Sequence, residues 1–187
     1  APEPDVFTST PTGYLLRAEF RVWHEADDLN YVMFRRDDPR TPVPVTAFPP
    51  GAPIIQALMP VLRDRLKRSE TLRRKLFQVE FLATLSGQML VTLAYHRKLD
   101  EQWQDAVAQL RPALAPDFPE LSFVGRSRKQ KLVVGADHVL ETLPIDGREY
   151  HYRQYEQAFT QPNGRVNIHM IEWACDRAAQ CSGDLLE

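Results

Sequence analysis

The stretch that most constrains the fold is Lys75–Lys98, which reads KLFQVEFLATLSGQMLVTLAYHRK. Residues on either side of Ser86-Gly87 alternate between two faces with a period of two, which is typical of β-strands. A serine followed by a glycine suits a tight turn between two strands. We therefore expect a long β-hairpin, in which a two-residue turn would place Phe77 opposite His96 on one face.

Basic residues gather at the open end of this hairpin: Arg73, Arg74, Lys75, Arg97 and Lys98. Cations beside an aromatic ring suit a nucleic-acid loop, because phosphates bind the charges and an unpaired base stacks on the ring. The alternative is a core hairpin whose flanking charges are merely solvated. On these residues alone the second interpretation is favoured.

Composition limits where a nucleic acid could bind. The 187 residues are 43% hydrophobic and 26% charged, as expected of a soluble globular protein with a real core. The formal net charge is −2 and the isoelectric point about 6.2, so any RNA contact must come from a local patch. Besides the hairpin end, one run without acids carries four cations: Arg126, Arg128, Lys129 and Lys131.

Cys175 and Cys181 are the only cysteines, too few for a disulfide framework and without the spacing of a zinc site. We therefore expect no metal, a reducing cytoplasm, and a packing role for Cys175. No apolar stretch approaches the ~20 residues that span a bilayer, and the chain does not start like a signal peptide. The sequence predicts a protein that is neither inserted in a membrane nor exported.

The first part of the chain reads as a lead-in followed by a β-meander. Residues 1–13 hold three prolines and no periodicity, whereas Tyr14–His24 and Leu29–Arg36 alternate as strands. One face of the first strand is apolar. The other face could meet RNA or simply be solvated, and it carries Arg17, Glu19, Arg21 and Trp23. Pro39–Pro50 carries five prolines, which indicates a rigid surface connection.

Helical spacing recurs in two places. Apolar residues from Ile54 to Leu66 predict an amphipathic helix, which Pro60 should kink or split. Asp100 is a plausible N-cap for a second helix with an apolar stripe of Trp103, Val107, Leu110 and Leu114. Between residues 121 and 154, short segments separated by turns predict strands of an antiparallel sheet.

The last section differs in kind. Phe159–Asn163 should open a helix with Pro162 in its first turn, and Gly183 should end it. Asp184–Glu187 then resembles the start of a buried strand, and a helix, a glycine and an apolar strand in this order are how an α/β domain begins. We expect a fragment in three parts: an extended lead-in (1–13), an RNA-recognition α+β domain (14–158), and the start of a truncated Rossmann-like domain (159–187).

Several stretches together resemble the bacterial tRNA (uracil-5-)-methyltransferases: RAEFRVWH, KLFQVEFLATLSGQ with its YHRKLD exit, VGRSRK, YRQYEQAFTQPN and GDLLE. They cover nearly the whole chain in the family's order. The resemblance implies an enzyme that uses S-adenosyl-L-methionine (SAM) to form 5-methyluridine in the T-loop of tRNA. It also implies that the attacking cysteine and the glutamate base lie beyond Glu187, so we expect no catalytic residue here, no activity by itself, and a monomer.

The resemblance assigns roles to particular residues. Gln161 would contact SAM, although the residues alone also allow it to be an N-cap. Arg21 and Phe77 would lie close to the target nucleotide, His96 joins them through the hairpin register, and four cations would contact phosphates: Arg97, Lys98, Arg126 and Lys129. Alternatives left open are a free-standing RNA-binding module, a domain that contacts another protein, and a fragment of a related enzyme that methylates ribosomal RNA.

Overall fold

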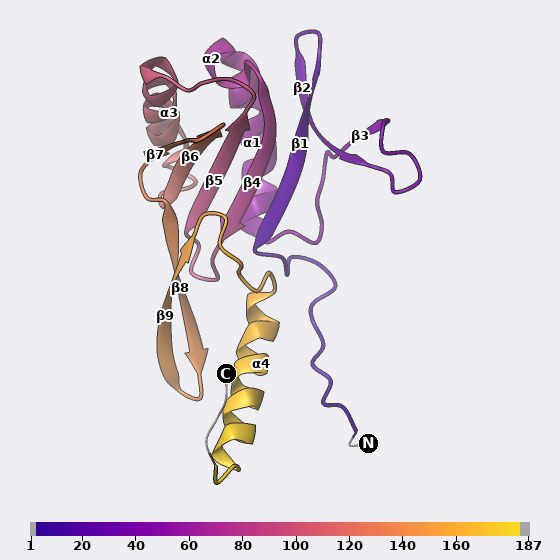
Figure 1. Cartoon of the computed structure of the whole chain (residues 1–187), viewed down its shortest axis with the longest axis vertical. Coiled ribbons are helices and arrows are strands. Elements are labelled where there is room, and N and C mark those ends of the chain that lie inside the picture. The colour runs from indigo at the N-terminus through magenta and orange to yellow at the C-terminus, as the bar shows by residue number, and fades with distance from the viewer. Residues whose placement is uncertain (1–2, 184–187) are drawn as a thin grey trace.

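A seven-stranded sheet lies at the centre of the computed structural model, which describes residues 3–183 (Figure 1). Its strand order is β3-β2-β1-β4-β5-β6-β7. The strands are β1 (Arg17–Glu25), β2 (Asp28–Phe34), β3 (Pro42–Pro44), β4 (Leu76–Ala83), β5 (Met89–Tyr95), β6 (Leu121–Ser127) and β7 (Gln130–Val134). Sheet and helices together confirm the predicted α+β class.

Three helices cover one face of this sheet: α1 (Pro53–Arg68), α2 (Glu70–Arg73) and α3 (Glu101–Leu114). The alternation predicted for β1 is confirmed, because Ala18, Phe20 and Val22 are buried in the main core under these helices. The residues that alternate with these three along β1, such as Arg21, lie on the opposite face of the sheet. We call this second face of the sheet the open face.

The antiparallel pairing predicted for residues 121–154 is confirmed for β6 with β7, but the sheet also contains one parallel pair. β5 and β6 are parallel, because α3 connects them as a crossover that returns the chain to the same end of the sheet. A separate two-stranded sheet holds β8 (His138–Ile145) and β9 (Arg148–Tyr155). Figure 1 shows this hairpin extending from the end of the sheet at which β1 begins.

The predicted hairpin exists, but its register differs by one residue. The last pair before the loop is Ala83 with Met89, so the loop is longer than Ser86-Gly87. The ladder then shifts by one residue at Phe77, which stands in a β-bulge and has no direct partner.

The two core helices follow their apolar stripes. Pro60 does not split α1, because it lies on the exposed side of the helix while Ile55, Leu58 and Leu62 stay buried on both sides of it. The cap predicted for α3 is confirmed, since the Asp100 carboxylate accepts a hydrogen bond of 3.1 Å from the backbone N–H of Trp103.

The last helix, α4 (Gly164–Ala179), begins and ends elsewhere than predicted. Asn163 is its N-cap, with Oδ1 accepting from the Val166 N–H at 3.1 Å, so Pro162 precedes the helix. The helix also ends before Gly183, and the strand expected at 184–187 lies outside the described residues. The packing role expected for Cys175 is wrong, because its side chain is exposed on α4.

Candidate nucleic-acid interface

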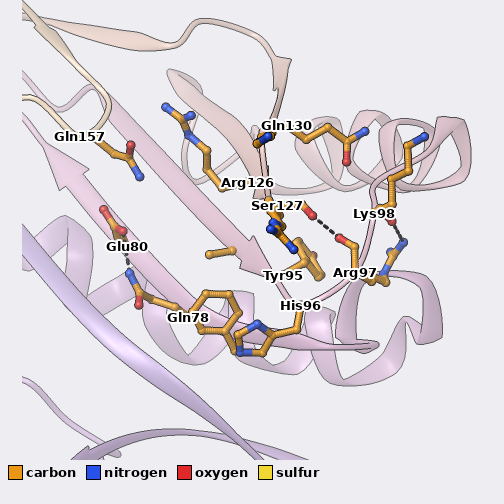
Figure 2. A pocket seen from close by; sticks show the side chains of 14 residues that line it. Gln78, Glu80, Tyr95, His96, Arg97, Lys98, Arg126, Ser127, Gln130 and Gln157 are labelled. Carbon is orange, nitrogen blue, oxygen red and sulfur yellow. Dashed lines mark hydrogen bonds between the residues drawn. The ribbon is translucent and has the colours of Figure 1, made fainter.

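A groove of about 900 Å³ opens on the open face where β4, β5 and β6 approach the loop that follows β5 (Figure 2). Its polar lining includes Gln78, Glu80, Ser127, Arg128, Gln130 and Gln157. Six of the seven residues predicted to contact RNA also line it: Phe77, His96, Arg97, Lys98, Arg126 and Lys129. Residues that are up to 52 positions apart in the sequence therefore meet at one site.

A three-layer column stands at one end of the groove. The rings of Phe77 and His96 are stacked, with centroids 3.9 Å apart and planes 11° from parallel. The guanidinium carbon of Arg21 lies 5.6 Å from the Phe77 centroid. Arg21 is therefore next to the groove residues, although it does not line the groove itself. Phe77 and His96 both line the groove, and His96 is the more exposed of the two.

Backbone contacts hold the loop that carries His96. The His96 N–H donates to the Lys75 carbonyl at 2.9 Å, and the His24 Nε2 lies 2.7 Å from the Leu76 carbonyl oxygen. Lys75 has a φ of 61°, in the left-handed region that L-residues rarely adopt. Local strain is thus present next to the column, where the surrounding contacts hold the backbone in place.

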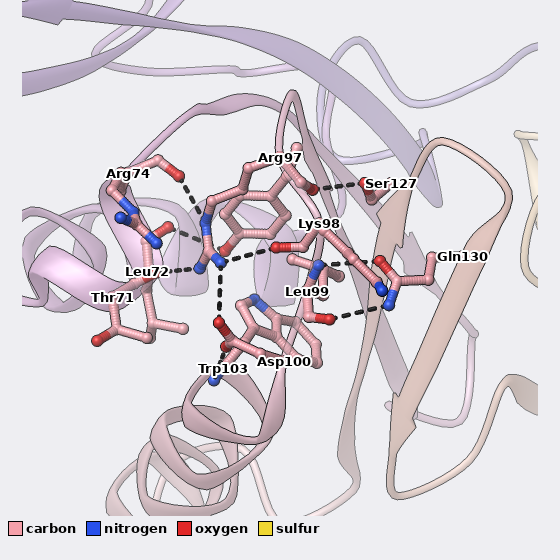
Figure 3. Close-up of polar contacts among 11 residues, drawn as sticks. Thr71, Leu72, Arg74, Arg97, Lys98, Leu99, Asp100, Trp103, Ser127 and Gln130 are labelled. Carbon is pink, nitrogen blue, oxygen red and sulfur yellow. Dashed lines mark hydrogen bonds and ion pairs between the residues drawn. The ribbon is translucent and has the colours of Figure 1, made fainter.

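Arg97 stabilises the rim of the groove from inside (Figure 3). Its guanidinium donates to the backbone carbonyls of Arg74 at 3.1 Å, Thr71 at 2.6 Å and Lys98 at 3.0 Å, and its side chain is 10% exposed. It also lies 5.2 Å from the centroid of the Tyr95 ring. These contacts occupy most of its donors, so the geometry supports a role in positioning Lys98 more than a direct phosphate contact.

Arg126 lies on the opposite side of the groove and is paired with a buried carboxylate. Its Nε donates to Glu156 Oε1 at 2.8 Å and its Nη2 donates to Oε2, an ion pair that raises the pKa of the guanidinium. Lys131 also approaches Glu156, with Nζ 3.8 Å from Oε2. Lys98 and Lys129, in contrast, are exposed on the rim, as a phosphate contact requires.

Gln161 lies away from the groove, in the segment before α4. It is not the N-cap, which is Asn163, so the alternative reading of Gln161 as a cap is wrong. Its Nε2 donates to Met170 Sδ at 3.6 Å, and a thioether is a weak acceptor. The Gln161 side chain is partly exposed, and its contact with SAM stays a prediction.

Gln78 and Ala94 are among the groove residues that sequence reasoning missed. Gln78 could have been noticed, because it is polar and falls on the face of β4 opposite to Val79 and Phe81. Ala94 carries no chemical signal at all. Its importance depends on the strand order, which brings Gln78 and Arg126 to either side of it.

A sequence profile of the family described as tRNA (uracil-5-)-methyltransferase matches residues 1–187. The chain belongs to the tRNA (uracil-5-)-methyltransferase family. Two curated members of the family, each named tRNA/tmRNA (uracil-C(5))-methyltransferase, illustrate the similarity. The protein of Dechloromonas aromatica is 52% identical over 182 residues, which are 97% of this chain and 49% of that protein. The protein of an Azoarcus species is 52% identical over 186 residues, covering 100% of this chain and 50% of the relative. The chain thus spans about half the length of these family members.

A solved structure shares the fold. The Pyrococcus abyssi tRNA (uracil-54, C5)-methyltransferase, in complex with S-adenosyl-L-homocysteine, superposes with a TM-score of 0.62. The match covers 89% of this chain and 41% of that one at 11% identity, so it speaks for the architecture alone.

Residues 3–183 contain neither a candidate membrane span nor a candidate metal site. No helix there combines the length and the apolar character needed to cross a membrane. The same residues hold no group of three or more His, Cys, Asp or Glu side chains placed to bind a metal ion.

Proposed function

We propose that this chain is the RNA-recognition part of a SAM-dependent methyltransferase that forms 5-methyluridine in the T-loop of tRNA. Family membership supports the reaction, and the relatives' names support tRNA as the substrate class. The observation that carries the recognition role is the column of Arg21, Phe77 and His96 beside a rim with exposed lysines. Planar side chains next to cations are what a single-stranded loop needs, because its bases are unstacked and its phosphates are charged.

The side chains at this site would have different roles in binding RNA. An unstacked base would lie on the exposed face of His96, with Phe77 supporting the imidazole from behind. Stacking of this kind contributes ~1–3 kcal/mol per base. Lys98 and Lys129 would contact phosphates, and each alone would contribute little, since phosphate binding is spread over many charges.

Methyl transfer would depend on groups outside the groove. SAM would supply the methyl group, and Gln161 would hold one of its polar atoms, with residues 159–187 forming the start of the domain that binds it. Neither Cys175 nor Cys181 lines the groove, and both are exposed, so neither is placed to attack a base held there. We accordingly expect this chain alone not to methylate RNA, and the whole protein to act as a monomer in the cytoplasm.

The test is binding of the chain to a T-arm stem-loop RNA, compared with the same stem carrying a scrambled loop, over a series of salt concentrations. We expect preferential binding that weakens as salt rises, because counterions are released from the phosphates. A protein-contact domain would bind neither RNA, and a general RNA-binding module would bind both equally.

Two matched variants locate the contact. Phe77→Ala removes the support of His96 and should weaken T-arm binding about fivefold or more, since a stacked base is worth ~1–3 kcal/mol. Phe34→Ala removes an exposed aromatic ring of β2, outside the groove, and should change nothing. An unchanged dissociation constant for Phe77→Ala at fixed salt would contradict the proposed site.

A further inference from the structure

The floor of the groove is a row of residues that runs straight across the sheet. The register pairs Arg21 with Gln78, Gln78 with Ala94, and Ala94 with Arg126. Neighbouring strands lie about 4.8 Å apart, so the backbones of Gln78 and Arg126 are separated by roughly 9.6 Å. Only the methyl group of Ala94 stands between them, which leaves an open space with a polar side chain on each side (Figure 2).

The Gln78 amide has a fixed orientation. Its Nε2 donates to Glu80 Oε1 at 2.7 Å, and an ionised carboxylate can only accept. Burial raises the pKa of the Glu80 carboxyl; the hydrogen bond from Gln78 opposes that rise, as does Arg17, whose Nη2 lies 3.7 Å from Oε2. The Gln78 oxygen is consequently directed away from Glu80 and acts as an acceptor beside the open space.

The opposite wall offers a donor. Nε and Nη2 of Arg126 are taken by Glu156, which leaves Nη1 of the same guanidinium for a further acceptor. Because Glu156 is buried, this ion pair holds the guanidinium in place. An acceptor on one wall and a cationic donor on the other match a ligand edge that carries an N–H beside a carbonyl oxygen.

We propose that the space above Ala94 is a slot for one keto base, uracil or guanine, of a single-stranded RNA loop. The imino N–H of the base donates to the Gln78 oxygen, its carbonyl oxygen accepts from Arg126, and the stacked rings of Phe77 and His96 close one end of the slot. This inference rests on the proposed function and adds a base contact to it.

Filling the slot tests its position. Ala94→Met places a long side chain on the floor and should weaken T-arm binding about tenfold, the loss typical of one well-formed base contact. Ala108→Met makes the same change at an exposed position of α3, behind the sheet, and should bind as the unaltered chain does. Circular dichroism and thermal unfolding show whether each variant folds, and a folded Ala94→Met with unchanged affinity would overturn the slot.

A second test leaves the slot open and asks whether Gln78 recognises the hydrogen-bonding edge of the base. Gln78→Met keeps the side-chain length but removes the acceptor. The unaltered chain should bind a uridine hexamer about tenfold more tightly than an N3-methyluridine hexamer, because the methyl group replaces the imino proton. Gln78→Met should bind both equally. Equal affinities in the unaltered chain would refute edge reading, even if Ala94→Met fails to fold.

The two proposals fail in different ways. Preference for the T-arm over the scrambled loop, with no effect of Ala94→Met or N3-methylation, would leave the proposed function standing and eliminate the slot. Discrimination between the two hexamers without any preference for the T-arm would retain the slot and reject recognition of the T-loop by this chain.

Discussion

A single methyl group at Gly125 should disturb both the core and the groove. Gly125 lies in the middle of β6, where a Cβ would stand 2.5 Å from Trp103 Cη2, 2.6 Å from Trp103 Cζ2 and 2.7 Å from Leu99 Cδ1. Real side chains do not tolerate such distances. Trp103 is fully buried and belongs to the capped first turn of α3, so it cannot move without shifting that helix.

The expected cost of Gly125→Ala follows from these contacts. Overpacking a core typically costs 1–3 kcal/mol, and three clashes with buried groups place this site at about 2–3 kcal/mol. For a chain of this size, each kcal/mol lowers the melting temperature by roughly 2–4 °C, which gives a fall of roughly 4–12 °C. Leu99 follows the loop that carries Lys98, so the rim of the groove should shift and RNA binding should weaken as well.

Differential scanning calorimetry of a double-mutant cycle separates this clash from a general defect. Both Trp103 atoms that would meet the new Cβ belong to the six-membered ring of the indole. Trp103→Phe replaces the indole with a shorter side chain that lacks these two atoms. The double variant should therefore lose less stability than the sum of the two single variants, by at least 1 kcal/mol on the scale of coupled neighbours. Additivity within about 0.5 kcal/mol would refute the argument.

Three further outcomes are expected. Glu141→Ala removes a buried carboxylate that accepts from two backbone N–H groups, and should cost about 2–4 kcal/mol in urea unfolding, whereas the exposed Glu149→Ala should cost little. Burial raises the pKa of Glu141 above 4.5, so its native form holds a proton more tightly than the unfolded form. The contribution of Glu141 to stability is therefore greatest below pH 4.5, falls as pH rises through the raised pKa, and is constant above that pKa. Melting temperatures measured from pH 4 to 8 should show this fall in the unaltered chain and lack it in Glu141→Gln. Parallel pH profiles of the two proteins would contradict the role of Glu141. Finally, Asn163→Ala removes the N-cap of α4 and should cost ~1 kcal/mol, visible as faster hydrogen exchange at the start of that helix, while Asn167→Ala should leave exchange there unchanged.

Local patterns predicted the parts of the fold that depend on neighbouring residues. The alternation in β1 identified its buried face, and the spacing from Trp103 to Leu114 identified the buried stripe of α3 together with its Asp100 cap. Such features are visible in sequence because a strand or helix turns one fixed set of positions toward the core.

Non-local features could not be predicted in this way. The parallel pairing of β5 with β6 depends on the path of α3 behind the sheet, and no residue pattern in either strand predicts it. The row from Gln78 through Ala94 to Arg126 exists only once those strands are neighbours. The ion pair of Arg126 with Glu156 likewise requires the chain to return after β9.

The bulge at Phe77 explains how a wrong register still led to the right pair of residues. In a regular strand Phe77 would share the face of Val79 and Phe81, which are fully buried, and would point into the core. One extra residue reverses the alternation, so that Leu76 fills the core position and Phe77 turns toward the groove. The two-residue turn assumed from sequence introduced an offset of one residue, and the bulge moved Phe77 in a way that compensated for it. The stack with His96 is therefore a product of the irregularity, which fits the tendency of bulges to redirect side chains at functional sites.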